Sequence, residues 1–154
     1  MTAIDEYRRL LEHLVGVYEV ESVLEIGVQK GISTEVFCEM GCSVRGIDTK
    51  DKGYRHENLV FIKGDASEYL SKLARTPTFD IAYLDAHYTY KRLKQDVPRI
   101  WDMVDKAIIF NEYIDFADHR KGEVRKFVNE WTHKMNITPF TVYPLRNGLA
   151  VVAK

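Results

Sequence analysis

Short apolar runs alternate along this chain with stretches in which apolar residues recur every three or four positions. Helical spacing of the apolar residues predicts an amphipathic helix over residues 1–18. The apolar run 22–26 is short and ends at a glycine, which predicts a strand. Residues 31–40 place their apolar residues on one helical face and stop at Gly41, so a strand, a glycine-bearing turn and a helix follow one another.

The same cycle repeats through the rest of the chain. Further strands are expected at 43–47, 59–62, 79–84 and 106–110, and further helices at 67–74, 89–104 and around 124–131. Pro98 falls inside one helical stretch and predicts two short helices, the second capped by Asp96. The last two strands, 137–143 and 149–153, are joined by too few residues for a parallel crossover, so they are expected to pair antiparallel.

Alternating strands and helices predict an α/β fold of the Rossmann-like, three-layer type, with a mainly parallel sheet covered on both faces. The 154 residues are expected to form one domain, 1–154, with an N-terminal helix over 1–19. The net charge of -1 makes nucleic acid an unlikely partner, because such binding needs clustered basic residues. No apolar run is long enough to cross a membrane, and the amphipathic N-terminus does not resemble a signal peptide, so a cytoplasmic protein is expected.

Polar residues and glycines follow each of the first five predicted strands. In open α/β sheets the ligand lies at the carboxyl ends of the strands, close to the point where the strand order reverses. A set of polar residues at these ends therefore indicates a nucleotide-type site better than any one of them does alone. The set comprises Gly27, Gly31, Asp48, Asp65, Asp85, Asn111 and Glu112.

The glycine spacing indicates which cofactor this site takes. A dinucleotide fold requires G-x-G-x-x-G to bring the backbone close to a pyrophosphate, whereas here Gln29 stands at the middle position. S-adenosylmethionine carries no phosphate and needs a carboxylate for its ribose hydroxyls. Asp48 lies 21 residues after Gly27, as expected for that carboxylate, and Asp65 can accept from the adenine amino group. Glu25 can anchor the turn or face the ammonium group of the ligand.

Taken in order, the motifs of residues 20–154 are LEIGVQKGIST, RGID, KGDA, FDIAYLDAHYTYKRLKQDV, IIFNEY, GEVRKFVNEW and NGLAVV. The chain resembles the class I S-adenosylmethionine-dependent methyltransferases, within them the small sugar O-methyltransferases of natural-product synthesis and the related catechol O-methyltransferase-like group. The resemblance implies a seven-stranded sheet whose last strand is antiparallel. It also implies a cofactor site formed by Glu25, Gly27, Val28, Gly31, Asp48, Thr49, Asp65, Ala66 and Asp85.

The related families activate an alcohol acceptor with a divalent cation held by acidic residues at the ends of the fourth and fifth strands. By resemblance, Asp85, Asn111 and Glu112 would hold Mg²⁺, which is chemically reasonable because all three offer oxygen ligands. The family places a histidine three residues after the first acid, whereas Tyr88 stands there and His87 comes one residue earlier. Two alternatives stay open: His87 reaches the site from its loop, or Tyr88 serves as the polar partner. Asp85, His87 and Tyr88 are therefore the candidate catalytic residues.

The chain is too short for a separate substrate domain, which leaves the acceptor undefined. In the loop 113–122, Asp115, Asp118 and His119 are candidate substrate contacts. The favoured function is methylation of a small molecule, with dimerisation as one way to complete an exposed site. The alternatives are a binding or regulatory module that has lost transfer activity and, less favoured, a nicotinamide-dependent oxidoreductase.

Overall fold

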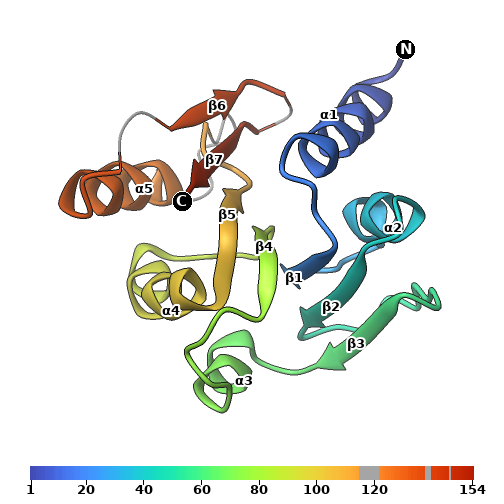
Figure 1. Ribbon diagram of the computed structural model, residues 1–154, viewed down its shortest axis with the longest axis horizontal. Coiled ribbons are helices and arrows are strands. Elements are labelled where there is room, and N and C mark those ends of the chain that lie inside the picture. The colour runs from blue at the N-terminus through green and yellow to red at the C-terminus, as the bar shows by residue number, and fades with distance from the viewer. Residues whose placement is uncertain (115–121, 138–139, 146) are drawn as a thin grey trace.

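The computed structural model describes residues 1–114, 122–137, 140–145 and 147–154 (Figure 1). Its seven strands are β1 (Ser22–Ile26), β2 (Ser43–Asp48), β3 (Leu59–Lys63), β4 (Phe79–Leu84), β5 (Val104–Phe110), β6 (Thr141–Tyr143) and β7 (Leu149–Ala153). The helices are α1 (Ala3–Val17), α2 (Ile32–Glu39), α3 (Ala66–Ser71), α4 (Tyr90–Met103) and α5 (Glu123–Lys134).

All seven strands form one sheet in the order β3-β2-β1-β4-β5-β7-β6. Strands β1 to β5 pair parallel with one another, whereas β7 pairs antiparallel with both β5 and β6. The predicted α/β fold with an antiparallel last strand is thus confirmed. The strand order reverses between β1 and β4, which makes their carboxyl ends the expected place for a ligand.

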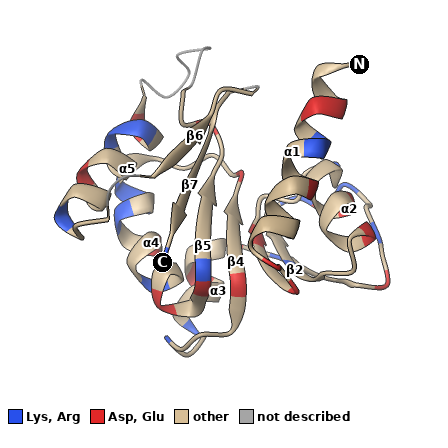
Figure 2. Cartoon of the chain, turned by 45° about the horizontal axis from the view of Figure 1, so that its top comes forward, with Lys and Arg blue, Asp and Glu red and all other residues tan. Residues whose placement is uncertain are grey.

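Helices cover both faces of the sheet and produce three layers (Figure 1). Helices α1 and α2 pack on one face through a core that includes Leu11 and Phe37. Helices α3, α4 and α5 cover the other face, where Leu70, Ile100 and Val128 are fully buried. Figure 2 shows that charged residues of both signs occur on the helices of both layers.

The structure corrects two predictions about individual elements. Helix α4 is one continuous helix that includes Pro98, and no second helix starts at Asp96. Asp96 is buried instead and accepts a hydrogen bond from Ser67 Oγ at 2.8 Å. The apolar face of α4 stays packed on the sheet on both sides of the proline, and this packing compensates for the one backbone hydrogen bond that proline removes. Among the described residues, the strand predicted at 137–143 is limited to Thr141–Tyr143.

The two cysteines, Cys38 and Cys42, are buried and do not form a disulfide. Burial raises the pKa of each thiol to about 11. Within the described residues, no helix is both long enough and apolar enough to cross a membrane.

Candidate functional site

A cavity of about 260 Å³ opens at the carboxyl ends of β1, β2, β3 and β4, beside the point where the strand order reverses. Backbone hydrogen bonds continue past the strand ends here, since Gly27 N–H donates to Ile47 O at 2.9 Å and Asp85 N–H donates to Ile26 O at 2.8 Å. These bonds hold the loops that follow the strands side by side. The lining residues are Ile26, Gly27, Gln29, Ile47, Asp48, Thr49, Gly64, Asp65, Ala66, Asp85, Ala86, His87, Tyr88 and Arg92.

Gly27 allows the loop after β1 to touch the loop after β4. Its φ is +94°, and a Cβ there would lie 2.2 Å from the backbone oxygen of Asp85. Both the left-handed conformation and the close approach require glycine. Gln29 joins the same two loops, because its side-chain Nε2 donates to Asp85 O at 3.0 Å. The predicted glycine turn therefore shapes the floor of the cavity.

Asp48 is the last residue of β2, and its carboxylate lies at the cavity wall. One carboxylate oxygen accepts from Gln29 N at 2.8 Å and the other from Lys50 N at 3.1 Å. These backbone donors fix the orientation of the carboxylate, yet each oxygen keeps capacity for a further donor. This is the arrangement needed to accept two hydroxyl groups from one ligand.

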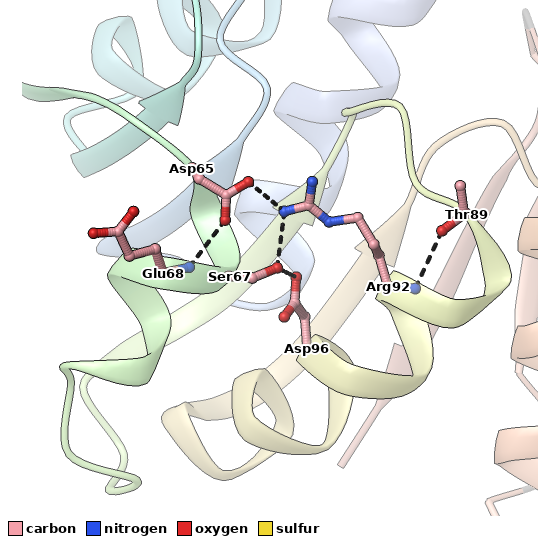
Figure 3. Close-up of polar contacts among 6 residues, drawn as sticks. All are labelled: Asp65, Ser67, Glu68, Thr89, Arg92 and Asp96. Atoms are coloured by element: carbon pink, nitrogen blue, oxygen red, sulfur yellow. Dashed lines mark hydrogen bonds and ion pairs between the residues drawn. The ribbon is translucent and has the colours of Figure 1, made fainter.

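Asp65 caps the start of α3 and forms an ion pair with Arg92 of α4 (Figure 3). Its Oδ1 accepts from Glu68 N at 3.0 Å, and its Oδ2 accepts from Arg92 Nη2 at 2.7 Å. The Glu68 N–H and then the guanidinium lower the pKa of the Asp65 carboxyl, which keeps it ionised as an acceptor. Ala66, the first residue of α3, also lines the cavity.

Three predicted cofactor residues lie behind the cavity wall and are not among those that line it. Glu25 is fully buried and accepts hydrogen bonds from the Ser33 and Thr34 hydroxyls at the start of α2, the Thr34 bond being 2.6 Å long. Burial raises the pKa of the Glu25 carboxyl to about 8, against the lowering effect of these two hydroxyls. Glu25 thus fixes α2 relative to β1.

The other two residues behind the wall are Val28 and Gly31. Val28 is buried and packs against Gly46 of β2, where a Cβ would lie 2.5 Å from a Val28 methyl group. Gly31 has a φ of +84° and lies against the ring of Tyr54, leaving no room for a side chain. Both residues shape the turn through packing.

The three candidate catalytic residues all line the cavity but differ in their surroundings. Asp85 and the exposed His87 lie at the end of β4. Tyr88 is buried, and among the described residues its hydroxyl has no hydrogen-bond partner. Burial and the nearby Asp96 raise the pKa of the Tyr88 phenol, so this group stays protonated and is a poor base. Of the two alternatives, His87 has the exposed side chain and Tyr88 the buried one.

The predicted metal ligands are only partly brought together. The Asn111 side-chain amide donates to the Asp85 carboxylate, so these two residues are in direct contact. The third predicted ligand, Glu112, is the next residue in the chain and has a left-handed backbone conformation with a φ of 61°. Within the described parts of the chain, no group of three His, Cys, Asp or Glu side chains could hold a metal ion. The Mg²⁺ site, which also includes the Asn111 amide, stays a prediction.

The three candidate substrate contacts, Asp115, Asp118 and His119, all lie outside the described residues. Six lining residues were not among the predicted site residues, and two of them, Gln29 and Arg92, have polar side chains. For Arg92 a signal was available, since it lies in the first turn of the helix that follows the Asp85 loop. For Gln29, the sequence indicates only that it replaces a glycine of the dinucleotide motif.

The charge of the cavity wall restricts the kind of ligand that it can hold. The lining contains three carboxylates, from Asp48, Asp65 and Asp85, and one guanidinium, from Arg92. The wall is therefore net negative when His87 is neutral, which disfavours a pyrophosphate and favours a ligand that carries positive charge.

No family model matches the sequence, and no curated protein matches it either. Solved structures do match the fold. One is the O-methyltransferase from Bacillus cereus in complex with SAH, at TM-score 0.74 and 19% identity, covering 97% of this chain and 81% of the other. Another is the O-methyltransferase TomG from Streptomyces achromogenes in complex with SAM, at TM-score 0.71 and 16% identity, covering 96% of this chain and 79% of the other.

A third match is the SAH-bound methyltransferase PaMTH1 from Podospora anserina, at TM-score 0.70 and 14% identity, covering 96% of this chain and 78% of the other. The chain thus spans about four fifths of the length of each of these proteins. Each of the three matches covers at least 96% of this chain. On this basis the chain has the fold of the S-adenosylmethionine-dependent O-methyltransferases.

Proposed function

We propose that this chain is an S-adenosylmethionine-dependent methyltransferase that transfers a methyl group to an oxygen atom of a small molecule. The observation that carries the proposal is the net-negative cavity at the reversal of strand order, with a glycine turn on its floor and a carboxylate at each of three strand ends. S-adenosylmethionine carries a positive sulfonium and no phosphate, so its charge is complementary to that wall.

The lining residues provide a separate group for each part of the cofactor. Asp48 is proposed to accept the two ribose hydroxyls, because both of its carboxylate oxygens are held in place by backbone donors. Asp65 is proposed to accept from the adenine amino group. Gly27 would let the methionyl part approach the backbone, since no side chain covers the turn there.

Transfer itself is a displacement in line at the methyl carbon. A bond forms between the acceptor oxygen and the methyl carbon while the bond from that carbon to sulfur breaks, and the electron pair stays on sulfur to give S-adenosylhomocysteine. The proton of the acceptor hydroxyl passes to a base. Asp85 and His87 are proposed for this step, because they line the cavity at the end of β4. A Mg²⁺ ion held by Asp85, Asn111 and Glu112 would lower the pKa of the acceptor hydroxyl.

Calorimetric titration with S-adenosylhomocysteine tests the cofactor assignment. The wild-type chain should bind it, and Asp48→Asn should weaken binding at least about tenfold because hydrogen bonds to a charged acceptor are lost. Asp51→Asn is the matched control, since Asp51 lies on the same connection but pairs with Arg55 at the surface. No binding to the wild-type chain would overturn the proposal.

Transfer is then measured with radiolabelled S-adenosylmethionine and a panel of catechols, sugars and other small hydroxyl compounds. We expect label to enter at least one hydroxyl acceptor, and transfer to fall in Asp85→Ala while affinity for S-adenosylhomocysteine is retained. Repeating the assay with EDTA and then with added Mg²⁺ tests the metal prediction. Equal transfer under both conditions would contradict a role for the cation.

A further inference from the structure

A chain of polar contacts links α3 and α4 at the Asp65 end of the cavity (Figure 3). Arg92 Nη2 donates to Asp65 Oδ2 at 2.7 Å and to Ser67 Oγ at 2.8 Å. Ser67 Oγ in turn donates to Asp96 Oδ2 at 2.8 Å. Because Asp96 is only 3% exposed, the chain of contacts is anchored in the protein interior while Arg92 reaches the cavity.

Most of the hydrogen-bonding capacity of Arg92 is not used within the described residues. A guanidinium has five N–H donors. Here its side-chain bonds and ion pair all involve the single nitrogen Nη2. The side chain is 40% exposed and lines the cavity, so Nη1 and Nε remain available to a ligand.

Asp65 and Arg92 therefore present an acceptor and a donor next to each other. The carboxylate keeps lone pairs beyond those used by Glu68 N and Arg92, and the guanidinium keeps N–H groups beyond the one that binds Asp65. The ion pair between them also fixes their separation. Such a pair recognises a ligand edge on which a donor stands beside an acceptor.

An adenine ring has this edge, because its 6-amino group donates and the neighbouring ring nitrogen accepts. A 6-oxo purine differs, since its carbonyl accepts where the amino group of adenine donates. We infer that Arg92 is a specificity-determining residue, which binds a ring nitrogen of the cofactor's adenine while it holds Asp65 against the 6-amino group. The inference rests on the proposed function, since it concerns the adenine of the same cofactor.

Tyr88 provides an independent reason to expect a ligand at this end. It lines the cavity, its side chain is buried, and its hydroxyl has no hydrogen-bond partner among the described residues. Buried polar groups are nearly always satisfied, by protein, water or ligand. The charges of Asp96, Arg92 and Asp65 all affect the pKa of this hydroxyl, and among them Asp96 has the largest effect.

The test compares S-adenosylhomocysteine with its 6-oxo analogue, S-inosylhomocysteine, by calorimetric titration. We expect the wild-type chain to prefer the adenosine compound by about 100-fold or more, because the mismatched purine leaves polar groups unpaired. Arg92→Met should weaken binding of the adenosine compound by about 10- to 100-fold and narrow the preference between the two. Arg99→Met is the matched control, since Arg99 lies on the same helix and bonds to α3 through Leu70 O but does not line the cavity.

Arg92→Lys separates recognition of the purine from simple support of Asp65. Lysine keeps the positive charge beside Asp65 but has no second nitrogen. We therefore expect the melting temperature of Arg92→Lys to match that of the wild type, while its affinity for S-adenosylhomocysteine stays at least about tenfold lower than that of the wild type. Full affinity in Arg92→Lys, or in Arg92→Met, would overturn the inference and leave the proposed function intact. Failure of the wild-type chain to bind S-adenosylhomocysteine would overturn both.

Discussion

Replacing Glu25 with glutamine should remove a large pH dependence from the stability of this protein. Glu25 is fully buried, and its carboxyl has a pKa of about 8 in the folded state against an ordinary value of 4.5. As the pH rises through this interval, the unfolded chain loses the Glu25 proton while the folded chain keeps it. Ionisation therefore favours the unfolded state, and stability falls as the pH rises from 4.5 towards 8.

The size of the effect follows from the difference between the two pKa values. Each pKa unit corresponds to about 1.4 kcal/mol, so between pH 5 and pH 8 the wild-type chain should lose about 3 to 4 kcal/mol through Glu25. Glutamine has no charge to lose and contributes no such slope. Its amide can still bond to the Ser33 and Thr34 hydroxyls, because a hydroxyl can donate or accept.

The assay is urea unfolding, followed by tryptophan fluorescence at several pH values between 5 and 8. The free energy of unfolding of Glu25→Gln, relative to that of the wild type, should rise by about 3 to 4 kcal/mol over this range. Titrating groups that do not interact with Glu25 cancel in this difference. Glu68→Gln is the matched control, since Glu68 is exposed on α3 and should show no such rise. An equal difference at pH 5 and at pH 8 would refute the reasoning, because it would mean that Glu25 is ionised in the folded protein.

Three further changes have clear expected outcomes. Gly27→Ala should abolish S-adenosylhomocysteine binding in calorimetry, because the alanine Cβ would lie 2.2 Å from the Asp85 carbonyl oxygen. Retained affinity would show that the loops after β1 and β4 can move apart without loss of binding. Tyr88→Phe should raise the free energy of unfolding of the ligand-free protein, measured by urea unfolding, by about 1 to 3 kcal/mol, because it removes a buried hydroxyl without a partner among the described residues. A loss of stability in this variant would mean that the hydroxyl has a partner. Cys38 and Cys42, whose pKa values are raised to about 11, should react with a thiol reagent only after unfolding, and rapid reaction of the native protein would contradict their burial.

Most elements were predictable because their sequence signals are local. The strands Ser22–Ile26 and Phe79–Leu84 lie where short apolar runs bounded by turn residues predicted them. Pro98 misled the prediction for α4, since a local rule cannot account for the packing that supports the helix on both sides of it. The parallel pairing followed from the alternation of strands and helices, and the antiparallel pairing of the last two strands followed from their short connection.

The candidate site was predictable as far as the backbone alone determines it. The carboxyl ends of parallel strands meet at one edge, so Asp48, Asp65 and Asp85 were expected together, and all three line the cavity. The direction of each side chain was not predictable. Glu25, which could either anchor the turn or face the ligand, bonds to the start of α2. Arg92, which was not predicted as a site residue, reaches from α4 to Asp65.

Local sequence signals were sufficient to predict the order of strands and helices along the chain, the glycine at the turn after β1 and the polar residues that follow each strand. These features depend on a few neighbouring residues, through backbone conformation and hydrophobic periodicity. The assembled fold determines which of those polar groups face the cavity, which are buried behind it and which pair with one another. That choice depends on contacts between residues far apart in the chain, such as Asp65 and Arg92, which are 27 positions apart. Packing determines these contacts only when all the layers are assembled.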